Sequence, residues 1–169
     1  EEFKHIITAF RAAIPEITIS TDIICGFPTE TDAQFEETLA LAKEMRFDVM
    51  NISRFWSRPG TKAAGMKQLP GRLIKERTKH LMALQGRISL EQNKRWIGWK
   101  GTLLIDEIGK NGTSVGRNYC YRPVVVGGNL KLGDVVEAEI VDATRLDLRA
   151  RVLAEMQASV PDARISYKR

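Results

Sequence analysis

The sequence has few cysteines, and they lie far apart. Among 169 residues there are only Cys25 and Cys120, and neither has a second cysteine or a histidine near it at the spacing of metal ligands. This pattern predicts neither a disulfide framework nor a zinc or iron–sulfur site within the chain. A reduced, cytoplasmic protein fits so small a number of cysteines best.

Long hydrophobic runs are also missing. No apolar stretch approaches the ~18 residues that a membrane-spanning helix needs, and residues 1–5 lack the basic region and apolar stretch of a signal peptide. The first residue is not a methionine. We therefore expect a soluble piece of a longer protein that has no membrane partner. Hydrophobic residues still make up 43% of the chain, which is enough for one domain or two small ones.

Acidic residues are scarce in the middle of the chain. Residues 54–95 hold 11 basic and only two acidic residues, whereas residues 1–53 hold four basic and ten acidic ones. A basic block of this kind is typical of contact with a phosphate-rich partner, but a solvated helix face has the same composition. Charge alone leaves both interpretations open.

The first half of the sequence predicts alternating helices and strands. Apolar residues at three- and four-residue spacing predict a helix over residues 1–14. The β-branched run of residues 17–25 predicts a strand covered on both faces, and residues 47–55 predict a second strand. Thr31 and Gln34 form the capping box of a helix between these strands. This order is typical of the α/β units that build a barrel or a doubly wound sheet.

A loop and a long helix follow. Residues 56–69 predict a loop with a Pro-Gly turn, and a helix begins at Pro70. Its apolar stripe includes Leu81 and Leu84, and the basic block is partly the surface of this helix, because basic residues occupy other positions. These basic residues are Arg72, Lys75, Arg77, Lys79, Arg87, Lys94 and Arg95.

The pattern changes after Gly101 to short runs of strand type separated by glycine or asparagine. The runs are residues 102–108, 112–121, 123–126, 135–141 and 146–153. Five short strands in about 55 residues predict a small antiparallel barrel of the OB-like kind. We therefore divide the chain into an α/β part (1–95), an all-β barrel (96–153) and a tail (154–169).

The first candidate site lies where the strand of residues 17–25 ends. A parallel strand that ends in a glycine turn before a helix presents backbone N–H groups and a helix N-terminus to a ligand. Gly26 would permit a close approach, but Gly26 and Pro28 also suit a simple turn between strand and helix. Cys25 is better explained as a small core residue than as a nucleophile, because no basic group stands near it in sequence.

The second candidate site is residues 54–58, at the end of the next strand. There Arg54 and Arg58 flank Phe55 and Trp56. Guanidinium groups paired with aromatic rings suit carboxylates, phosphates and nucleobases. An arginine stacked on a surface tryptophan explains the same residues equally well.

The third candidate site is the barrel segment of residues 116–122. Strand alternation would place Arg117, Tyr119 and Tyr121 on one face. Aromatic rings interleaved with arginine are typical of surfaces that bind single-stranded nucleic acid. The alternative places one tyrosine in the core and one at the rim. No catalytic set of residues emerges anywhere in the chain.

Four segments together resemble one known family. They are TDIICGFPTET (21–31), NISRFWSRPGTKAAGMKQLP (51–70), KER (75–77) and WIGWKGTLLIDEIGKNGTSVGRNYCYRPVVV (96–126). Over residues 2–153 the chain resembles the carboxyl-terminal part of the radical SAM methylthiotransferases, specifically the archaeal and eukaryotic group that acts on N6-threonylcarbamoyladenosine in tRNA. The resemblance implies that the α/β part is the last βα units of a TIM-like radical SAM barrel and that the β-barrel is a TRAM domain, which binds tRNA.

The resemblance also implies the chemistry of a complete enzyme. That enzyme would use S-adenosylmethionine and two 4Fe-4S clusters to methylthiolate C2 of the adenine next to the anticodon. The amino-terminal methylthiotransferase domain and the cysteine motif that hold the clusters are missing here, so we expect this chain alone to be inactive. Other branches of the family act on isopentenyladenosine or on a ribosomal protein. A stand-alone RNA-binding module is the remaining alternative.

Particular residues follow as candidates. Those that the resemblance places beside S-adenosylmethionine are Ile24, Gly26, Phe27, Pro28, Asn51 and Arg54, with Arg58 near the substrate. The candidates for RNA binding are Lys110, Arg117, Asn118, Tyr119, Tyr121 and Arg122. No catalytic residue and no metal ligand is assigned. Thr29 stands where the family commonly has the second glycine of GFPGET, a departure that bears on hydrogen-bond donation by the backbone there.

Overall fold

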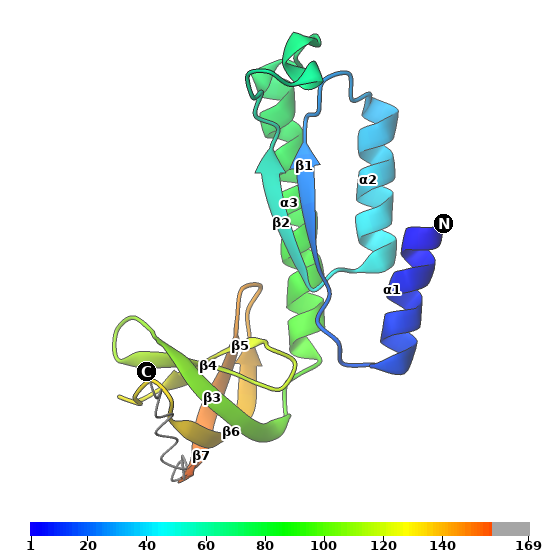
Figure 1. Cartoon of the computed structure of the whole chain (residues 1–169). Helices are drawn as coiled ribbons and strands as arrows, with labels where there is room; N and C mark the ends of the chain where they lie inside the picture. The colour runs from blue at the N-terminus through cyan, green and yellow to red at the C-terminus, as the bar shows by residue number, and fades with distance from the viewer. Residues whose placement is uncertain (157–169) are drawn as a thin grey trace, which may run out of the picture. The chain divides into compact units, whose positions relative to one another are not determined.

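The computed structural model describes residues 1–156, and these form two compact units (Figure 1). The first unit comprises residues 1–95 and 144–146, and the second comprises the rest of the described chain from Trp96. Residues 154–156, which the sequence places in a tail, belong to the last strand. The remainder of that tail lies outside the described residues. No helix within residues 1–156 is long and apolar enough to cross a membrane.

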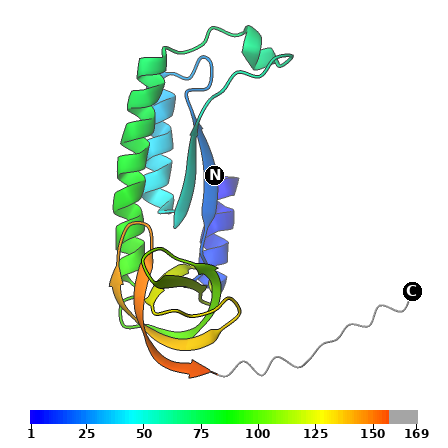
Figure 2. The same ribbon diagram turned by 90° about the vertical axis from the view of Figure 1, so that its left-hand side faces the viewer.

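The first unit contains a two-stranded parallel sheet. Its elements are α1 (Glu2–Ala13), β1 (Ser20–Cys25), α2 (Asp32–Met45), β2 (Val49–Arg54), the 3-10 helix η1 (Lys62–Gly65) and α3 (Gly71–Lys94). β1 and β2 run parallel with α2 between them in sequence, and α2 and α3 lie alongside the sheet (Figures 1 and 2). The predicted loop of residues 56–69 contains η1, and the predicted long helix after Pro70 is α3.

The capping box predicted for α2 is confirmed. The backbone N–H of Gln34 donates to Oγ1 of Thr31 at 3.2 Å, and the backbone N–H of Thr31 donates to the side-chain oxygen of Gln34 at 3.0 Å. These two bonds satisfy donors that have no partner within the first turn of a helix. The start of α2, and with it the length of the turn after β1, is therefore fixed by residues that are local in sequence.

Within residues 1–156 the sheet is covered on one face only, so this chain by itself does not supply the second cover that the β-branched run predicts. Cys25 and Met50 face the helices and are buried in the core. The opposite face carries Asp22, Ile24 and Asn51, which are exposed, and the side chain of Ile24 is 57% exposed. The β-branched run therefore identifies a strand correctly, but an apolar run does not show how many faces of the strand this chain itself covers.

The second unit is a closed barrel of five strands. They are β3 (Lys100–Ile108), β4 (Thr113–Arg117), β5 (Pro123–Gly127), β6 (Val135–Ala143) and β7 (Leu148–Met156). The strands follow one another around the barrel in the order β3-β4-β5-β7-β6. The number of strands agrees with the prediction. The core of the barrel includes Trp96, which precedes β3.

The barrel is mixed, and the prediction that it is antiparallel is wrong. β5 and β7 pair in parallel, with Val124 opposite Leu148, and every other neighbouring pair is antiparallel. The reason is geometric. A closed ring with an odd number of strands cannot alternate in direction all the way around, so at least one pair must be parallel.

Candidate cofactor wall and RNA interface

The turn after β1 is held by a carboxylate that also binds α3. The backbone N–H of Gly26 donates to Oε2 of Glu30 at 3.2 Å. Arg77 of α3 donates to the same oxygen at 2.5 Å and to Oδ1 of Asp32 at 2.6 Å. Burial tends to lower the pKa of Arg77, but the hydrogen bonds to Asp32 and Glu30 outweigh it and raise that pKa. The guanidinium therefore stays charged and fastens the turn to the helix.

The prediction that Arg77 belongs to the basic surface of the helix is wrong. Its side chain is 4% exposed, and its guanidinium lies 5.3 Å from the centre of the Phe35 ring. Arg77 is on the same side of α3 as Leu81 and Leu84, which are buried in the core. A buried arginine needs carboxylate partners. The signal that could have identified it is the acidic pair Glu30 and Asp32 in the segment between β1 and the first turn of α2, where a buried cation would find its partners.

Two residues of this turn have a left-handed backbone. Gly26 has φ of 82°, and a Cβ atom there would lie only 2.6 Å from Cγ1 of Ile74, so glycine is required both by conformation and by space. Thr29 has φ of 72°. A β-branched residue is strained in that region. Thr29 thus occupies, at a cost, a position that suits the glycine of the commoner family motif.

Cys25 is a core residue, as the sequence indicates. Its side chain is 1% exposed, and burial raises the pKa of its thiol, although a hydrogen bond with Thr78 acts in the opposite direction. A thiol with a raised pKa is a poor nucleophile because the reactive form is the thiolate. Cys25 therefore fills the core beneath the turn.

The open face of the sheet carries a polar pair at the centre of the two strands. Asn51 and Asp22 are neighbours in the parallel register, and Nδ2 of Asn51 donates to Oδ1 of Asp22 at 2.8 Å. This bond fixes the orientation of the amide and leaves its oxygen able to accept from a ligand. The sequence singles out Asn51 and Ile24, whereas Asp22 lies in the same candidate segment as Ile24 (residues 21–31) and receives no role from the sequence alone. The register of the two predicted strands, which sequence alone does not give, is what pairs it with Asn51.

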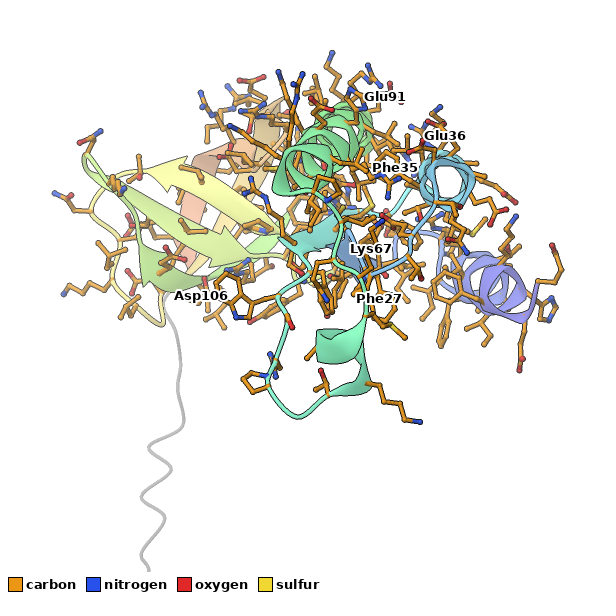
Figure 3. The ribbon with its side chains drawn as sticks, turned by 90° about the horizontal axis from the view of Figure 1, so that it is seen from above. Phe27, Phe35, Glu36, Lys67, Glu91 and Asp106 are labelled. Carbon is orange, nitrogen blue, oxygen red and sulfur yellow. The ribbon has the colours of Figure 1, made fainter. Side chains whose placement is uncertain are left out.

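Two aromatic rings meet at the carboxyl-terminal end of β1 and β2. Phe27 and Phe55 pack edge to face, with ring centres 5.3 Å apart, and the N–H of Phe55 donates to the carbonyl oxygen of Cys25 at 2.8 Å. Figure 3 shows Phe27 and Phe35 on opposite sides of the sheet. Pro28 is buried within the turn. The structure therefore brings the two predicted segments after β1 and β2 together through Phe27 and Phe55.

The remaining residues of the second candidate site are on the surface. Arg54 and Arg58 are exposed, and the side chain of Trp56 is 83% exposed. No guanidinium within residues 1–156 lies over the Trp56 ring. The carbonyl oxygen of Arg58 accepts from Oγ1 of Thr61 at 2.8 Å, which shapes the loop. The interpretation of an arginine stacked on Trp56 is therefore wrong for the described residues, and binding of a ligand by Arg54 and Arg58 stays a prediction.

In the barrel, the predicted strand of residues 112–121 is too long. β4 ends at Arg117, and Asn118 starts a tight loop. Oδ1 of Asn118 accepts from the N–H groups of Cys120 at 3.1 Å and Arg122 at 3.0 Å, and its carbonyl oxygen accepts from the N–H of Tyr121 at 2.8 Å. Asparagine side chains commonly hold turns in this way. Strand alternation therefore does not explain where the tyrosines lie.

The two tyrosines are nevertheless both on the surface of this loop. Tyr119 is 64% exposed, and its ring centre lies 6.2 Å from those of Trp96 and Trp99. Tyr121 is 73% exposed, and the guanidinium of Arg117 lies 5.1 Å from its ring centre. Neither ring is in the core, so the alternative that places one tyrosine there is wrong. The loop therefore exposes two rings: Tyr119 packs near Trp96 and Trp99, and Tyr121 lies beside Arg117.

Arg117 has an acidic partner that the sequence did not indicate. Its Nε donates to Oδ2 of Asp106 at 2.9 Å, across the β3–β4 pair. The bond fixes the guanidinium beside the Tyr121 ring and leaves the two terminal amino groups as donors. A β-bulge in β3 between Ile105 and Glu107 falls at Asp106. Because a bulge changes which residues oppose one another, sequence alternation could not predict this pair.

Three of the candidate RNA-binding residues do not contribute to the exposed surface of this loop. Asn118 and Arg122 are buried at 5% and 6% exposure, and the guanidinium of Arg122 lies 5.6 Å from the centre of the Trp96 ring. Their burial favours a role in shaping the loop, and direct contact of these two side chains with RNA stays a prediction. Lys110 is exposed, but it lies in the β3–β4 turn, at the opposite end of β4 from Arg117.

Comparison with known proteins identifies the barrel. Residues 94–153 match the family model of the TRAM domain. The chain is 41% identical, over 92% of its length, to a protein of Archaeoglobus fulgidus named probable threonylcarbamoyladenosine tRNA methylthiotransferase. It is 35% identical, over 95% of its length, to the threonylcarbamoyladenosine tRNA methylthiotransferase of Homo sapiens.

This chain is similar to proteins named as tRNA methylthiotransferases. The resemblance inferred from the sequence motifs is thereby confirmed. The chain spans 36% of the length of the Archaeoglobus protein and 28% of the length of the human one. It is also 40% identical, over 85% of its length, to a protein of Mycobacterium marinum named tRNA-2-methylthio-N(6)-dimethylallyladenosine synthase 1. Proteins named for two different nucleosides are therefore similar to it to nearly the same degree.

Proposed function

We propose that this chain forms the carboxyl-terminal part of a radical SAM enzyme that methylthiolates C2 of N6-threonylcarbamoyladenosine next to the anticodon of tRNA. The observation that carries the proposal is the TRAM barrel, whose loop after β4 exposes the rings of Tyr119 and Tyr121 beside Arg117. The names of the relatives support the choice of reaction and of nucleoside. The few cysteines favour a cytoplasmic enzyme.

In this proposal the barrel binds tRNA. Each exposed ring can stack on an unpaired base, and such stacking contributes roughly 1 to 3 kcal/mol. The terminal amino groups of Arg117 can donate to a phosphate or to a base edge. Because Trp96 and Trp99 support Tyr119, and Arg117 supports Tyr121, the rings lose little further freedom on binding.

The open face of the β1–β2 sheet fits one side of an S-adenosylmethionine site. Ile24 offers an apolar surface to an adenine ring, and the oxygen of Asn51 can accept from a hydroxyl or amino group, whereas the missing Cβ of Gly26 leaves room for Ile74 of α3. When bound, S-adenosylmethionine would supply the radical chemistry of the reaction. The chain's own residues would bind it, orient it and exclude water. In this proposal the first unit is the last part of a TIM-like radical SAM barrel.

The described residues do not fit a 4Fe-4S cluster. Cys25 is buried with a raised thiol pKa, and Cys120 belongs to the other unit. Residues 1–156 contain no group of three or more histidine, cysteine or acidic side chains that could hold a metal ion. Both clusters of the proposed enzyme therefore need residues other than these, and we expect the 169-residue chain alone to be inactive.

Binding of tRNA tests the role of the barrel directly. Tyr119→Ala and Tyr121→Ala should each weaken the affinity of the 169-residue chain for an anticodon stem–loop by roughly 5- to 150-fold, the range that corresponds to about 1 to 3 kcal/mol. Leu132→Ala is the matched control, because Leu132 is a large apolar side chain of the barrel that is 62% exposed. Unchanged affinity in both tyrosine variants would refute the proposal that these rings stack on bases of tRNA.

The nucleoside is tested in the organism that carries the gene. Deletion should remove the 2-methylthio group from N6-threonylcarbamoyladenosine in bulk tRNA, as measured by mass spectrometry of nucleosides. The similarity to the Mycobacterium protein makes the dimethylallyladenosine derivative the second candidate. Loss of the methylthio group from that nucleoside alone would replace the proposed substrate, and loss from neither would leave a stand-alone RNA-binding module as the better explanation.

A further inference from the structure

Five basic side chains form a stripe along the outer side of α3. They are Arg72, Lys75, Lys79, Arg87 and Lys94, which we call the α3 stripe, and all five are exposed. At 100° and 1.5 Å per residue, they lie within about 120° of one another around the helix axis and extend over about 33 Å along it. The stripe lies opposite Leu81, Leu84 and Ile88, which are in the core.

Most of the stripe is not neutralised by the protein. Arg72 pairs with Glu76 at 3.0 Å, but Lys75, Lys79, Arg87 and Lys94 form no ion pair within residues 1–156. The other acidic residue of α3 is Glu91, and it pairs with Arg46 at the end of α2. Figure 3 looks down on α3 and labels Glu91.

Some other basic side chains of the first unit do have acidic partners. Lys4 pairs with Glu44, Arg46 with Glu91, and the buried Arg77 with Glu30 and Asp32. Lys75 and Lys79, in contrast, are four residues apart on one helix, where like charges repel each other and destabilise the helix. A row of this kind does not stabilise the helix, and its charge is available to an external anion.

We propose that the α3 stripe binds the phosphate backbone of the RNA, as a binding surface separate from the rings of the barrel. This inference rests on the proposed function, because it assumes that RNA is the partner. The chemistry of the two surfaces differs. Phosphate binding by lysine and arginine positions a nucleic acid and releases bound counterions, whereas stacked rings engage individual bases. A row of cations on a straight helix suits a regularly charged backbone and carries no base specificity.

The test compares two pairs of lysines that carry the same charge. The stripe variant is Lys75→Gln with Lys79→Gln, and the control is Lys4→Gln with Lys43→Gln on α1 and α2. Affinity of the 169-residue chain for an unmodified tRNA transcript is measured over a range of salt concentrations. Removing one lysine–phosphate interaction should reduce the slope of log affinity against log salt by about 0.7 to 0.9. The stripe variant should therefore have a slope that is smaller by about 1.4 to 1.8, and its affinity at about 0.1 M salt should fall by up to roughly 25- to 60-fold.

The control should keep a slope close to that of the unchanged chain. If the stripe variant and the control have equal slopes of log affinity against log salt, while Tyr119→Ala still weakens binding, then the α3 stripe does not bind RNA. The proposed function would be unaffected by that result. No binding of tRNA by the unchanged chain at low salt would instead refute the proposed function.

A second experiment measures binding of the same variants to vesicles that contain phosphatidylserine. Loss of vesicle binding by the stripe variant, with its tRNA slope equal to that of the control, would assign the stripe to a lipid surface and refute the proposal.

Folding of the variants is checked by circular dichroism. Both stripe lysines are exposed, and neutralising them relieves repulsion, so the helix content should not fall. A second stripe variant, Arg87→Gln with Lys94→Gln, should reduce the slope by a similar amount. A reduction seen only with Lys75 and Lys79 would contradict an RNA-binding surface that runs the length of the helix.

Discussion

The guanidinium of Arg117 lies 5.1 Å from the ring centre of Tyr121, and the backbone of Tyr121 has φ of 60°. A non-glycine residue in this left-handed conformation is strained by roughly 1 to 2 kcal/mol. The ring of Tyr121 is 73% exposed, so it recovers little of that energy by burial. Backbone strain that is not offset by burial of the side chain is typical of functional positions.

Tyr121→Gly and Tyr121→Ala separate the backbone from the ring. Both variants remove the ring, so both should weaken RNA binding to the same extent. Only glycine removes the strain, and the glycine variant should therefore have a free energy of unfolding about 1 kcal/mol higher than the alanine variant. Urea denaturation of the two proteins measures this difference. If alanine and glycine are equally stable, the loop is not strained at Tyr121.

Thr29→Gly should stabilise the first unit. Thr29 has φ of 72° in the turn after β1, and a β-branched side chain is poorly accommodated there. Replacement by glycine should raise the free energy of unfolding by about 1 kcal/mol, and Thr29→Ala should raise it by less. Thermal unfolding monitored by circular dichroism compares the two. A glycine variant less stable than the threonine protein would show that the side chain makes an interaction worth more than the strain.

Arg77→Met should destabilise the first unit strongly. It leaves Glu30 without its buried partner, and breaking a buried pair from one side costs about 3 to 5 kcal/mol. Adding Glu30→Gln should recover part of the loss, because the uncompensated charge disappears. Arg72→Met is the control on the same helix, since its pair with Glu76 is exposed and worth less than about 0.5 kcal/mol. Equal effects at Arg77 and Arg72 would contradict the role of Arg77 as a clamp.

Asn118 should act on RNA binding only through the loop. Asn118→Ala leaves the N–H groups of Cys120 and Arg122 without their acceptor and should cost about 1 to 3 kcal/mol of barrel stability. Asn118→Asp keeps the acceptor oxygen and should retain more of the stability. In a double-mutant cycle for RNA affinity, Asn118→Ala and Tyr121→Ala should be less than additive, because both act on one ring. Full additivity would mean that Asn118 affects RNA by another route.

Features that depend on neighbouring residues could be predicted from the sequence. The capping box of Thr31 and Gln34 is one, and the five strands of the barrel are another. Each depends on propensities and spacings within a few residues. The sequence also predicts an exposed position for Tyr119 and Tyr121, but through the alternation of a strand, whereas Asn118 holds a loop there.

Features that depend on register or on a distant partner could not be predicted. Asp22 meets Asn51 only because β1 and β2 pair in one particular register, and Asp106 meets Arg117 across a bulge. Arg77 is similar to its basic neighbours in sequence, and only the packing of α3 against Glu30 distinguishes it. The sequence therefore identifies the glycine and apolar residues of the candidate cofactor site on the β1–β2 sheet. The hydrogen bonds and ion pairs that orient its polar side chains can be identified only from the fold.

The parallel pairing of β5 with β7 also bears on the timing of synthesis. β7 is the strand that closes the barrel, because it pairs with β5 on one side and with β6 on the other. Until the ribosome has released residues 148–156, β5 keeps one edge without a partner, and the rings on the loop before it are carried by an open sheet. The domain that would hold the RNA therefore completes its structure only when its last strand has left the ribosome, after the whole of the first unit's helices and strands has been made.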